Sequence, residues 1–297
     1  MSRVGLLAVL FVLAAVHSQP AYPQENKRLL LRVDDVGMCH TVNQAMQQLA
    51  ATGMPFSTSV MFACPWYLEA VDILKAHPQI AVGVHLTLNA EWQSYKWGPV
   101  LGKAVVPSLV DVNGYFFASH ADFASHEIGI DEVERELQAQ IERALRSGVR
   151  IDYLDYHMGT AVSTPELTAV VEKLAQHYAL GLSTYFDEAY QTIWHIPIDQ
   201  KKDSLYAAIE HLQVDRPNLM VVHVGLESPE MNALVDMNSS LMSSSSGESL
   251  VGRHRHAELN ALSARDFRKA IGKNRVTLIT YRDLIAQAGL KAMQRPE

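Results

Sequence analysis

The stretch Leu29-Leu30-Leu31-Arg32-Val33-Asp34-Asp35-Val36-Gly37 guides the interpretation of the whole sequence. Its first five residues are almost all apolar and predict a buried strand, which ends in two adjacent carboxylates. Ionised groups at the edge of a core are costly unless a metal or another cation pairs with them. We therefore expect Asp34 and Asp35 to belong to a functional site.

Length and composition indicate a globular protein with a large core. The chain has 297 residues, of which 48% are hydrophobic, so one large domain or at most two is expected. The formal net charge of -7 argues against nucleic acid or an anionic membrane surface as a partner.

The first residues differ in composition from the rest of the chain. Arg3 precedes the apolar run Val4 to Val16, and small residues follow, which is the pattern of a signal peptide. An uncleaved membrane anchor is the alternative, although no later segment reaches the roughly 18 apolar residues of a membrane span. We expect a signal peptide (1–18), a linker (19–28), one domain (29–290) and a tail (291–297). The mature protein would then be periplasmic or extracellular, away from the membrane.

Export would allow the two cysteines to be oxidised. Cys39 and Cys64 each follow a predicted strand, so they could form a disulfide across one rim of the fold. Two separate buried thiols are equally compatible with the sequence. A thiolate-rich zinc site needs more cysteines than the chain has.

Short apolar runs alternate with amphipathic stretches, which predicts an α/β fold with mainly parallel strands. The predicted strands are 29–33, 57–62, 81–88, 151–156, 180–185, 194–198, 219–224 and 276–280. The predicted helices are 42–51, 65–76, 131–147, 165–177, 264–271 and 282–288. Two long connections, 89–130 and 225–255, have the length of functional loops or mobile surface. The number of strands indicates a barrel.

Residues that can bind metals lie at or near the ends of three of the predicted strands. They are Asp34 and Asp35, then His85, and then Asp155 and His157. In a barrel of parallel strands the carboxyl ends of the strands form the site, so these side chains are expected to converge. Two imidazoles and one carboxylate suit Zn, Fe, Co, Ni or Mn, with open positions for water and substrate.

The same motifs resemble the YdjC-like, or ChbG-type, carbohydrate deacetylases. The resemblance rests on 33–37, on Gly83-Val84-His85-Leu86-Thr87-Leu88, on 154–157 and 219–225, and on the C-terminal stretches 258–262 and 279–284. It implies an irregular, TIM-like (β/α) barrel that removes N-acetyl groups from amino-sugar oligosaccharides. Asp35, His85 and His157 are the implied ligands of one divalent ion, for which Zn and Mg are favoured. Gly159 and Val224 depart from the usual histidine and proline of the family.

These residues can be given chemical roles. A divalent ion would activate water and polarise the acetamide carbonyl, and Asp34 would be the general base. The roles of Asp34 and Asp35 can also be exchanged, since alternation along a strand does not say which one faces the ion. His223 is expected to protonate the leaving amine, although a core histidine is a competing interpretation. Asp155 would orient His157 or His223.

Substrate contacts are expected from the long connections. Trp92, Tyr95 and Trp97 could stack on sugar rings or simply pack in the loop. Arg253 or Arg255 could reach the site, with the other solvated, and the neighbouring histidines 254 and 256 are expected at the surface. The same metal and base would also suit another amide or ester, and a non-catalytic carbohydrate-binding barrel is an alternative of a different class. The sequence leaves a homodimer open.

Overall fold

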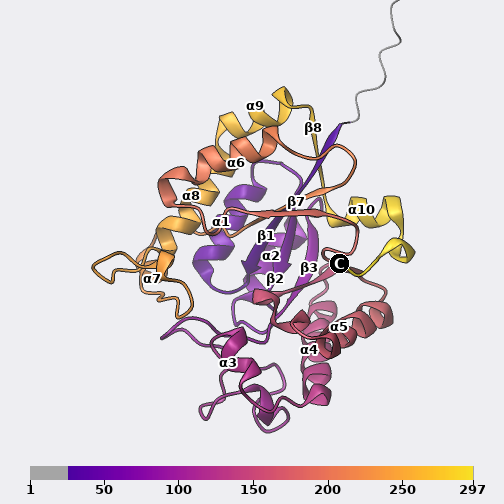
Figure 1. Cartoon of the computed structure of the whole chain (residues 1–297), viewed down its shortest axis with the longest axis vertical. Coiled ribbons are helices and arrows are strands. Elements are labelled where there is room, and N and C mark those ends of the chain that lie inside the picture. The colour runs from indigo at the N-terminus through magenta and orange to yellow at the C-terminus, as the bar shows by residue number, and fades with distance from the viewer. Residues whose placement is uncertain (1–25, 297) are drawn as a thin grey trace, which may run out of the picture.

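The computed structural model describes residues 26–296, in which parallel strands form one curled sheet surrounded by helices (Figure 1). The strands are β1 (Lys27–Val36), β2 (Ser57–Val60), β3 (Ala81–Leu86), β4 (Tyr153–Tyr156), β5 (Gly181–Leu182), β6 (Ala189–Thr192), β7 (Asn218–Val222) and β8 (Val276–Ile279). Their order is β5-β4-β3-β2-β1-β7-β6, and β8 pairs with the start of β1. Within the described part no ladder joins β5 to β6, so the predicted (β/α) barrel is confirmed in an irregular, open form.

Helices cover the outside of the curled sheet (Figure 1). They are α1 (His40–Ala50), α2 (Tyr67–Ala76), α3 (His120–Ala124), α4 (Ile130–Arg146), α5 (Pro165–Tyr178), α6 (Lys201–Glu210), α7 (Pro229–Asn232), α8 (Val251–Ser263), α9 (Arg265–Lys273) and α10 (Tyr281–Ala288). Helices α4 and α5 pack on each other, as do α6, α8 and α9. The six predicted helices are present within a few residues of their predicted bounds.

Two regions differ from the sequence predictions. The predicted strand 194–198 is a turn, closed by a hydrogen bond from Ile196 N to Ile193 O, and the strand lies earlier, at β6. Pro197, which has no N–H to donate to a ladder, explains the end of regular structure there. Helix α8 begins inside the predicted long connection 225–255 and carries residues that were expected in a loop.

Strand β1 separates two cores. Leu29, Leu31 and Val33 belong to the large core beneath the outer helices, whereas Leu30 faces the barrel interior. The interior cluster also contains Tyr153, Phe186, Leu219, Val221, Tyr281 and Leu284. Helix α10 thus fills the amino-terminal half of the barrel with apolar side chains. The carboxyl-terminal half is left for polar groups.

The end of β1 is irregular. The pairing of β1 with β2 shifts register between Val33 and Val36, and Asp35 between them has a left-handed backbone with φ 63°. A bulge of this kind re-aims a side chain, because it breaks the alternation along the strand. As a result Asp34 and Asp35, though adjacent, both line the same cavity.

The two long connections meet each other above the strands. An isolated bridge joins Trp92 to Asp236, and Met237 N donates a hydrogen bond to Glu91 O. Cys39 and Cys64 are buried free thiols, which agrees with the second of the two alternatives for them. Among the described residues, no helix combines the length and apolar character needed to cross a bilayer.

Candidate metal centre and catalytic cavity

A cavity of about 580 Å³ opens at the carboxyl ends of the strands. It is lined by polar side chains from β1, β3, the segment after β4 and the end of β7. Those of the predicted site are Asp34, Asp35, His85, His157 and His223. Residues separated by nearly 190 positions in the sequence therefore meet in one place, as the strand-end argument predicted.

Three atoms converge in this cavity. Asp35 Oδ1 lies 3.4 Å from His85 Nε2 and 3.3 Å from His157 Nδ1, and the two nitrogens are 3.3 Å apart. These contacts lack hydrogen-bond geometry at the carboxylate, so the buried Asp35 Oδ1 has no hydrogen-bond partner. An unpartnered buried oxygen between two imidazole nitrogens is what a metal ligand set presents before the ion binds.

Carboxylates hold the outer nitrogens of both imidazoles. His85 Nδ1 lies 2.8 Å from Asp155 Oδ2, and His157 Nε2 lies 2.9 Å from Glu91 Oε2. Partners of this kind fix the tautomer and the ring orientation of metal-binding histidines. Asp155 was predicted to orient His157 or His223, but its partner is His85, and the contact of Glu91 with His157 was missed. Its signal was that it is the one charged residue in the stretch from Leu86 to Trp92.

The neighbouring charges also set the proton affinity of these groups. Burial lowers the pKa of His85, but the charge and hydrogen bond of Asp155 and the nearby Asp35 carboxylate outweigh it and raise the pKa to about 9. For His157, burial is outweighed by Glu91 and Asp35, and the pKa rises to about 10. The same carboxylates favour the protonated form of each ring, so a metal ion would compete with protons for the two nitrogens.

Taken together, the donor set fits a divalent ion. Asp35, His85 and His157 would hold it through one carboxylate oxygen and two imidazole nitrogens, the ligands that Zn and related metals prefer. Asp34, His85 and Asp155 also lie close enough together to be considered. That second set is occupied by a guanidinium.

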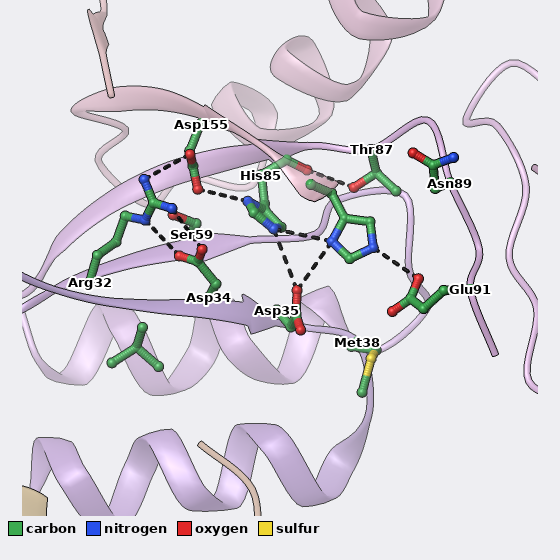
Figure 2. Close-up of polar contacts among 12 residues, drawn as sticks. Arg32, Asp34, Asp35, Met38, Ser59, His85, Thr87, Asn89, Glu91 and Asp155 are labelled. Atoms are coloured by element: carbon green, nitrogen blue, oxygen red, sulfur yellow. Dashed lines mark hydrogen bonds and ion pairs between the residues drawn. The ribbon is translucent and has the colours of Figure 1, made fainter. Parts of the chain in front are cut away.

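Arg32 is this guanidinium (Figure 2). Its Nε and Nη2 donate to the two oxygens of Asp34 at 2.7 and 2.8 Å, and Nη1 lies 2.8 Å from Asp155 Oδ1. Nη1 also donates to Ser183 Oγ at 2.5 Å. A bidentate pair of this kind fixes the plane of the Asp34 carboxylate. Figure 2 shows the resulting chain of contacts from Asp34 through Arg32 and Asp155 to His85.

A second arginine holds Asp35. Arg255 Nη2 donates to Asp35 Oδ2 at 2.6 Å. Burial raises the pKa of Asp35, but Arg255 and the two histidines outweigh it and hold the pKa well below its ordinary value. The guanidinium of Arg255 lies 5.8 Å from the ring of Trp92 and 5.3 Å from the ring of Trp194.

Helix α8 explains which arginine reaches the site. The sequence analysis proposed Arg253 as a site residue, but Arg253 is exposed and does not line the cavity, whereas Arg255 does. Two residues along a helix turn the side chain by about 200°, so the two arginines cannot share a face. His254, expected at the surface, is buried, and His256 is half-buried. One arginine in the site and one in solvent agrees with the expectation, but the surface positions expected for the histidines are wrong because the helix was not recognised.

His223 lines the cavity at the end of β7. Its ring packs against Trp194 with 4.6 Å between centroids, and its buried Nδ1 has no hydrogen-bond partner. Burial is the main cause that lowers the pKa of His223 to about 4, although Asp35 and Asp34 act in the opposite direction. The ring is therefore neutral at pH 7.

The aromatic side chains of the connection after β3 agree with the second alternative, packing within the loop. Trp92 lines the cavity but is 1% exposed, and its Nε1 donates to Met38 Sδ at 3.2 Å, so it does not offer a free face to a sugar. Trp97 is buried as well, and Tyr95 is half-buried. Tyr190 of β6, which the sequence analysis did not single out, lines the cavity and is 54% exposed.

Comparison with known families is consistent with this arrangement. The model of the YdjC-like protein family matches residues 28–273 of the chain. The chain belongs to the YdjC-like family. The match includes the strand-end residues of the cavity as well as Arg255 and Glu258 of α8.

Curated relatives of this YdjC-like protein are named carbohydrate deacetylases. One from Enterococcus faecalis (strain ATCC 700802 / V583) is 34% identical over 158 residues, which cover 53% of this chain and 58% of the relative. Carbohydrate deacetylase 1 of Listeria innocua serovar 6a is 26% identical over 263 residues, or 86% of this chain and all of the relative. A solved structure from Enterococcus faecalis V583, described as a cellobiose-phosphate cleavage protein, has a TM-score of 0.68 at 24% identity. It covers 87% of this chain and 99% of its own, and supports the fold.

The prediction of export requires correction. The segment 1–18, from which it was drawn, lies outside the described residues, and the family match begins only at residue 28. The comparison with carbohydrate deacetylases gives no support to a periplasmic or extracellular location, so that prediction is wrong. A short apolar run behind an arginine is a compositional pattern, and composition alone does not decide where a chain goes.

Proposed function

We propose that this YdjC-like protein is a metal-dependent hydrolase that removes N-acetyl groups from amino-sugar oligosaccharides. The observation that supports it is the convergence of Asp35 Oδ1, His85 Nε2 and His157 Nδ1 in the cavity, with Asp34 beside them. The carbohydrate deacetylases among the relatives support the choice of substrate. A divalent ion held by these three ligands would supply a Lewis acid for the acetamide carbonyl and a source of activated water.

The residues of the chain would handle the protons of the reaction. Water adds to the acetamide carbon, the C–N bond breaks, and acetate and a free amine are the products. Asp34 would accept the proton from water, because its carboxylate lines the cavity and is oriented by Arg32 without being one of the three converging ligands.

His223 would deliver a proton to the amine nitrogen, which otherwise leaves as a strongly basic anion. Because burial keeps the ring neutral at pH 7, His223 must first gain the proton that it passes on. Asp34, once protonated by the attacking water, would supply it. One proton is thereby transferred from water to the amine nitrogen through Asp34 and His223.

Acetate release from N-acetylated chitooligosaccharides tests the proposal. Purified protein should release acetate only when a divalent metal is present. The Asp34→Asn variant should lose about 100-fold or more in turnover, the range expected for loss of a general base. Its metal content should be unchanged, and the fold should persist because Arg32 keeps Asp155 as a partner.

Asp72→Asn is the matched control, since Asp72 is exposed on α2 and lies far from the cavity lining. This variant should release acetate like the unaltered protein. Absence of acetate release by the unaltered, metal-loaded protein across a panel of acetylated sugars would contradict the proposal and favour a carbohydrate-binding role.

A further inference from the structure

A buried ion pair lies behind the cavity wall that carries His223. Lys201 Nζ, at the start of α6, lies 2.6 Å from Glu258 Oε1 of α8, and both side chains are 0% exposed. Burying two charges is expensive, and apolar residues of similar volume often stabilise a fold as well or better. The cost of burying this pair points to a role beyond stability, which its other contacts define.

The second oxygen of Glu258 holds the backbone of His223. His223 N donates to Glu258 Oε2 at 2.6 Å, which ties the end of β7 to α8. On the other side of the pair, Lys201 Nζ donates to the carbonyl oxygens of Ile193 and Trp194 at 2.7 and 3.2 Å. The pair therefore joins two helices, one strand end and the segment after β6.

Trp194 connects this ion pair to the imidazole of His223. Its ring packs on His223 at 4.6 Å between centroids, and the guanidinium of Arg255 lies 5.3 Å from the same ring. Since His223 Nδ1 has no hydrogen-bond partner, the position of the ring depends on its backbone and on this indole. Glu258 holds the backbone N–H of His223, and Lys201 holds the backbone carbonyl of Trp194.

We propose that Lys201 and Glu258 are positioning residues, which together hold the imidazole of His223 in place through its backbone N–H and through Trp194. The inference rests on the proposed function, because it gives His223 its importance. It assigns a role to Glu258, which the chemistry of the cavity does not otherwise use. Glu258 begins the C-terminal stretch 258–262 on which the family resemblance partly rests.

Two double variants separate positioning from the burial of charge. Lys201→Met/Glu258→Gln removes both charges but keeps a side-chain carbonyl that accepts the N–H of His223. Lys201→Met/Glu258→Leu removes both charges and the acceptor. The matched control is Lys173→Met/Glu134→Gln, which removes an exposed pair with the same 2.6 Å separation.

We expect the Gln double variant, which keeps an acceptor for His223 N but loses the Lys201 contacts to Ile193 and Trp194, to lose less than about 10-fold in kcat. The Leu double variant should lose about 100-fold in kcat, the cost of a displacement near 1 Å in a catalytic group. Its KM should change by less than about threefold, because neither residue contacts substrate. The control should match the unaltered protein, and both buried variants should show similar melting temperatures.

A readout without catalysis comes from the imidazole ¹⁵N and ¹³C signals of His223 in the metal-free protein, assigned through His223→Gln. These signals should move most in the Leu double variant, less in the Gln double variant, and stay at their original positions in the control. Should the Leu double variant fail to fold, Trp194→Leu, which keeps both buried charges paired, must move the same signals.

Unmoved His223 signals in the folded Leu double variant, or in Trp194→Leu, would overturn the inference. So would equal kcat in the two folded double variants. If the unaltered protein releases no acetate, the proposed function fails, while the NMR comparison still decides whether the pair positions His223.

Discussion

Each candidate ligand turns one atom toward the cavity and has another held by a charged neighbour. Asp155 holds His85, Glu91 holds His157, and Arg255 holds Asp35. Such partners reduce the rotational freedom of the ligands before an ion arrives, so less ordering is required on binding.

Loss of one ligand should therefore reduce metal binding strongly. We expect His85→Ala to lower metal affinity by at least about 100-fold, the upper range seen even for partners of ligands. The measurement is metal content after dialysis against a buffered metal solution. His177→Ala, at an exposed position on α5, is the control. Equal occupancy in the His85 variant and the control would remove His85 from the site.

Part of this site can be predicted from residues alone. Asp34, Asp35, His85, Asp155 and His157 follow apolar runs, and parallel strands bring their ends together. The contacts of Glu91 and Arg255 could not be predicted in the same way. The contact of Glu91 depends on the path of the long connection after β3. The contact of Arg255 depends on the rotation of α8, whose first residues lie in the other long connection. Asp34 and Asp35 both face the cavity because of the left-handed φ of Asp35, which the sequence pattern does not predict.

At the level of elements, β3 places His85 against the neighbouring strand. Gly83, two residues earlier, lies beside the ring of Tyr153 in β4, and a Cβ added there would be 2.5 Å from that ring. Gly83→Ala should cost about 1–3 kcal/mol, as overpacking of a core does, because Tyr153 is fully buried. It should also weaken metal binding by shifting β3.

Chemical denaturation and metal titration measure both effects. The control is Gly272→Ala on α9, where an added Cβ meets nothing within 4 Å, so stability should be unchanged or slightly higher. If Gly83→Ala were as stable as the control, the close packing of β3 on β4 would be refuted.

Helix α8 should make stability depend on pH. Burial is the main cause that lowers the pKa of His254 to about 4, and the nearby Lys201 charge adds to it. Between pH 4 and about 6.5 the unfolded chain binds a proton that the folded chain does not, so stability falls as the pH decreases through this range. Above pH 6.5 this contribution is constant.

His254→Gln should reduce that dependence. Between pH 7 and pH 5 the unaltered protein should lose about 2 kcal/mol more stability than the variant, from about 1.4 kcal/mol per pH unit over 1.5 units. Urea denaturation at the two pH values measures the difference, and His223 contributes equally to both proteins. Identical losses would mean that His254 is accessible to protons in the folded state.

The elements were predictable where periodicity and burial agree. Helix α4 shows a regular apolar spacing, and its predicted bounds differ from the observed ones by one residue at each end. Helix α8 was hidden because its buried face includes Arg255 and Glu258, which sequence patterns assign to the surface. Strand β6 is only partly buried, so its sequence carries little apolar signal.

For the whole molecule, binding of a divalent ion should stabilise the fold, because the site draws on three separate strand regions. At an ion concentration of 100 times Kd the gain is about 2.7 kcal/mol. For a chain of this size it should raise Tm by roughly 5–10 °C. Thermal unfolding with a chelator and with added metal measures the shift. In His85→Ala the two melting curves should coincide, and a shift as large as in the unaltered protein would place the ion elsewhere.

The fold class followed from the alternation of strands and helices, but the closure of the barrel did not. Strand β5 has two residues and β6 is displaced from its predicted position, so the sheet is open between them. The cavity lies at the carboxyl end of this open sheet, and the exposed Tyr190 of β6 is part of its lining. The length of β5 and the position of β6 depend on local chain geometry, which composition and residue spacing do not predict.

The left-handed backbone at Asp35 has a consequence for related sequences. Besides glycine, asparagine and aspartate adopt this geometry most readily, whereas β-branched residues rarely do. Evolution at this position is thus restricted both by conformation and by charge. A homologue with Asp-Asn or Asp-Gly here would keep the bend but lose a carboxylate, and would be recognisable from these two residues as a barrel that lacks one ligand of the proposed metal site.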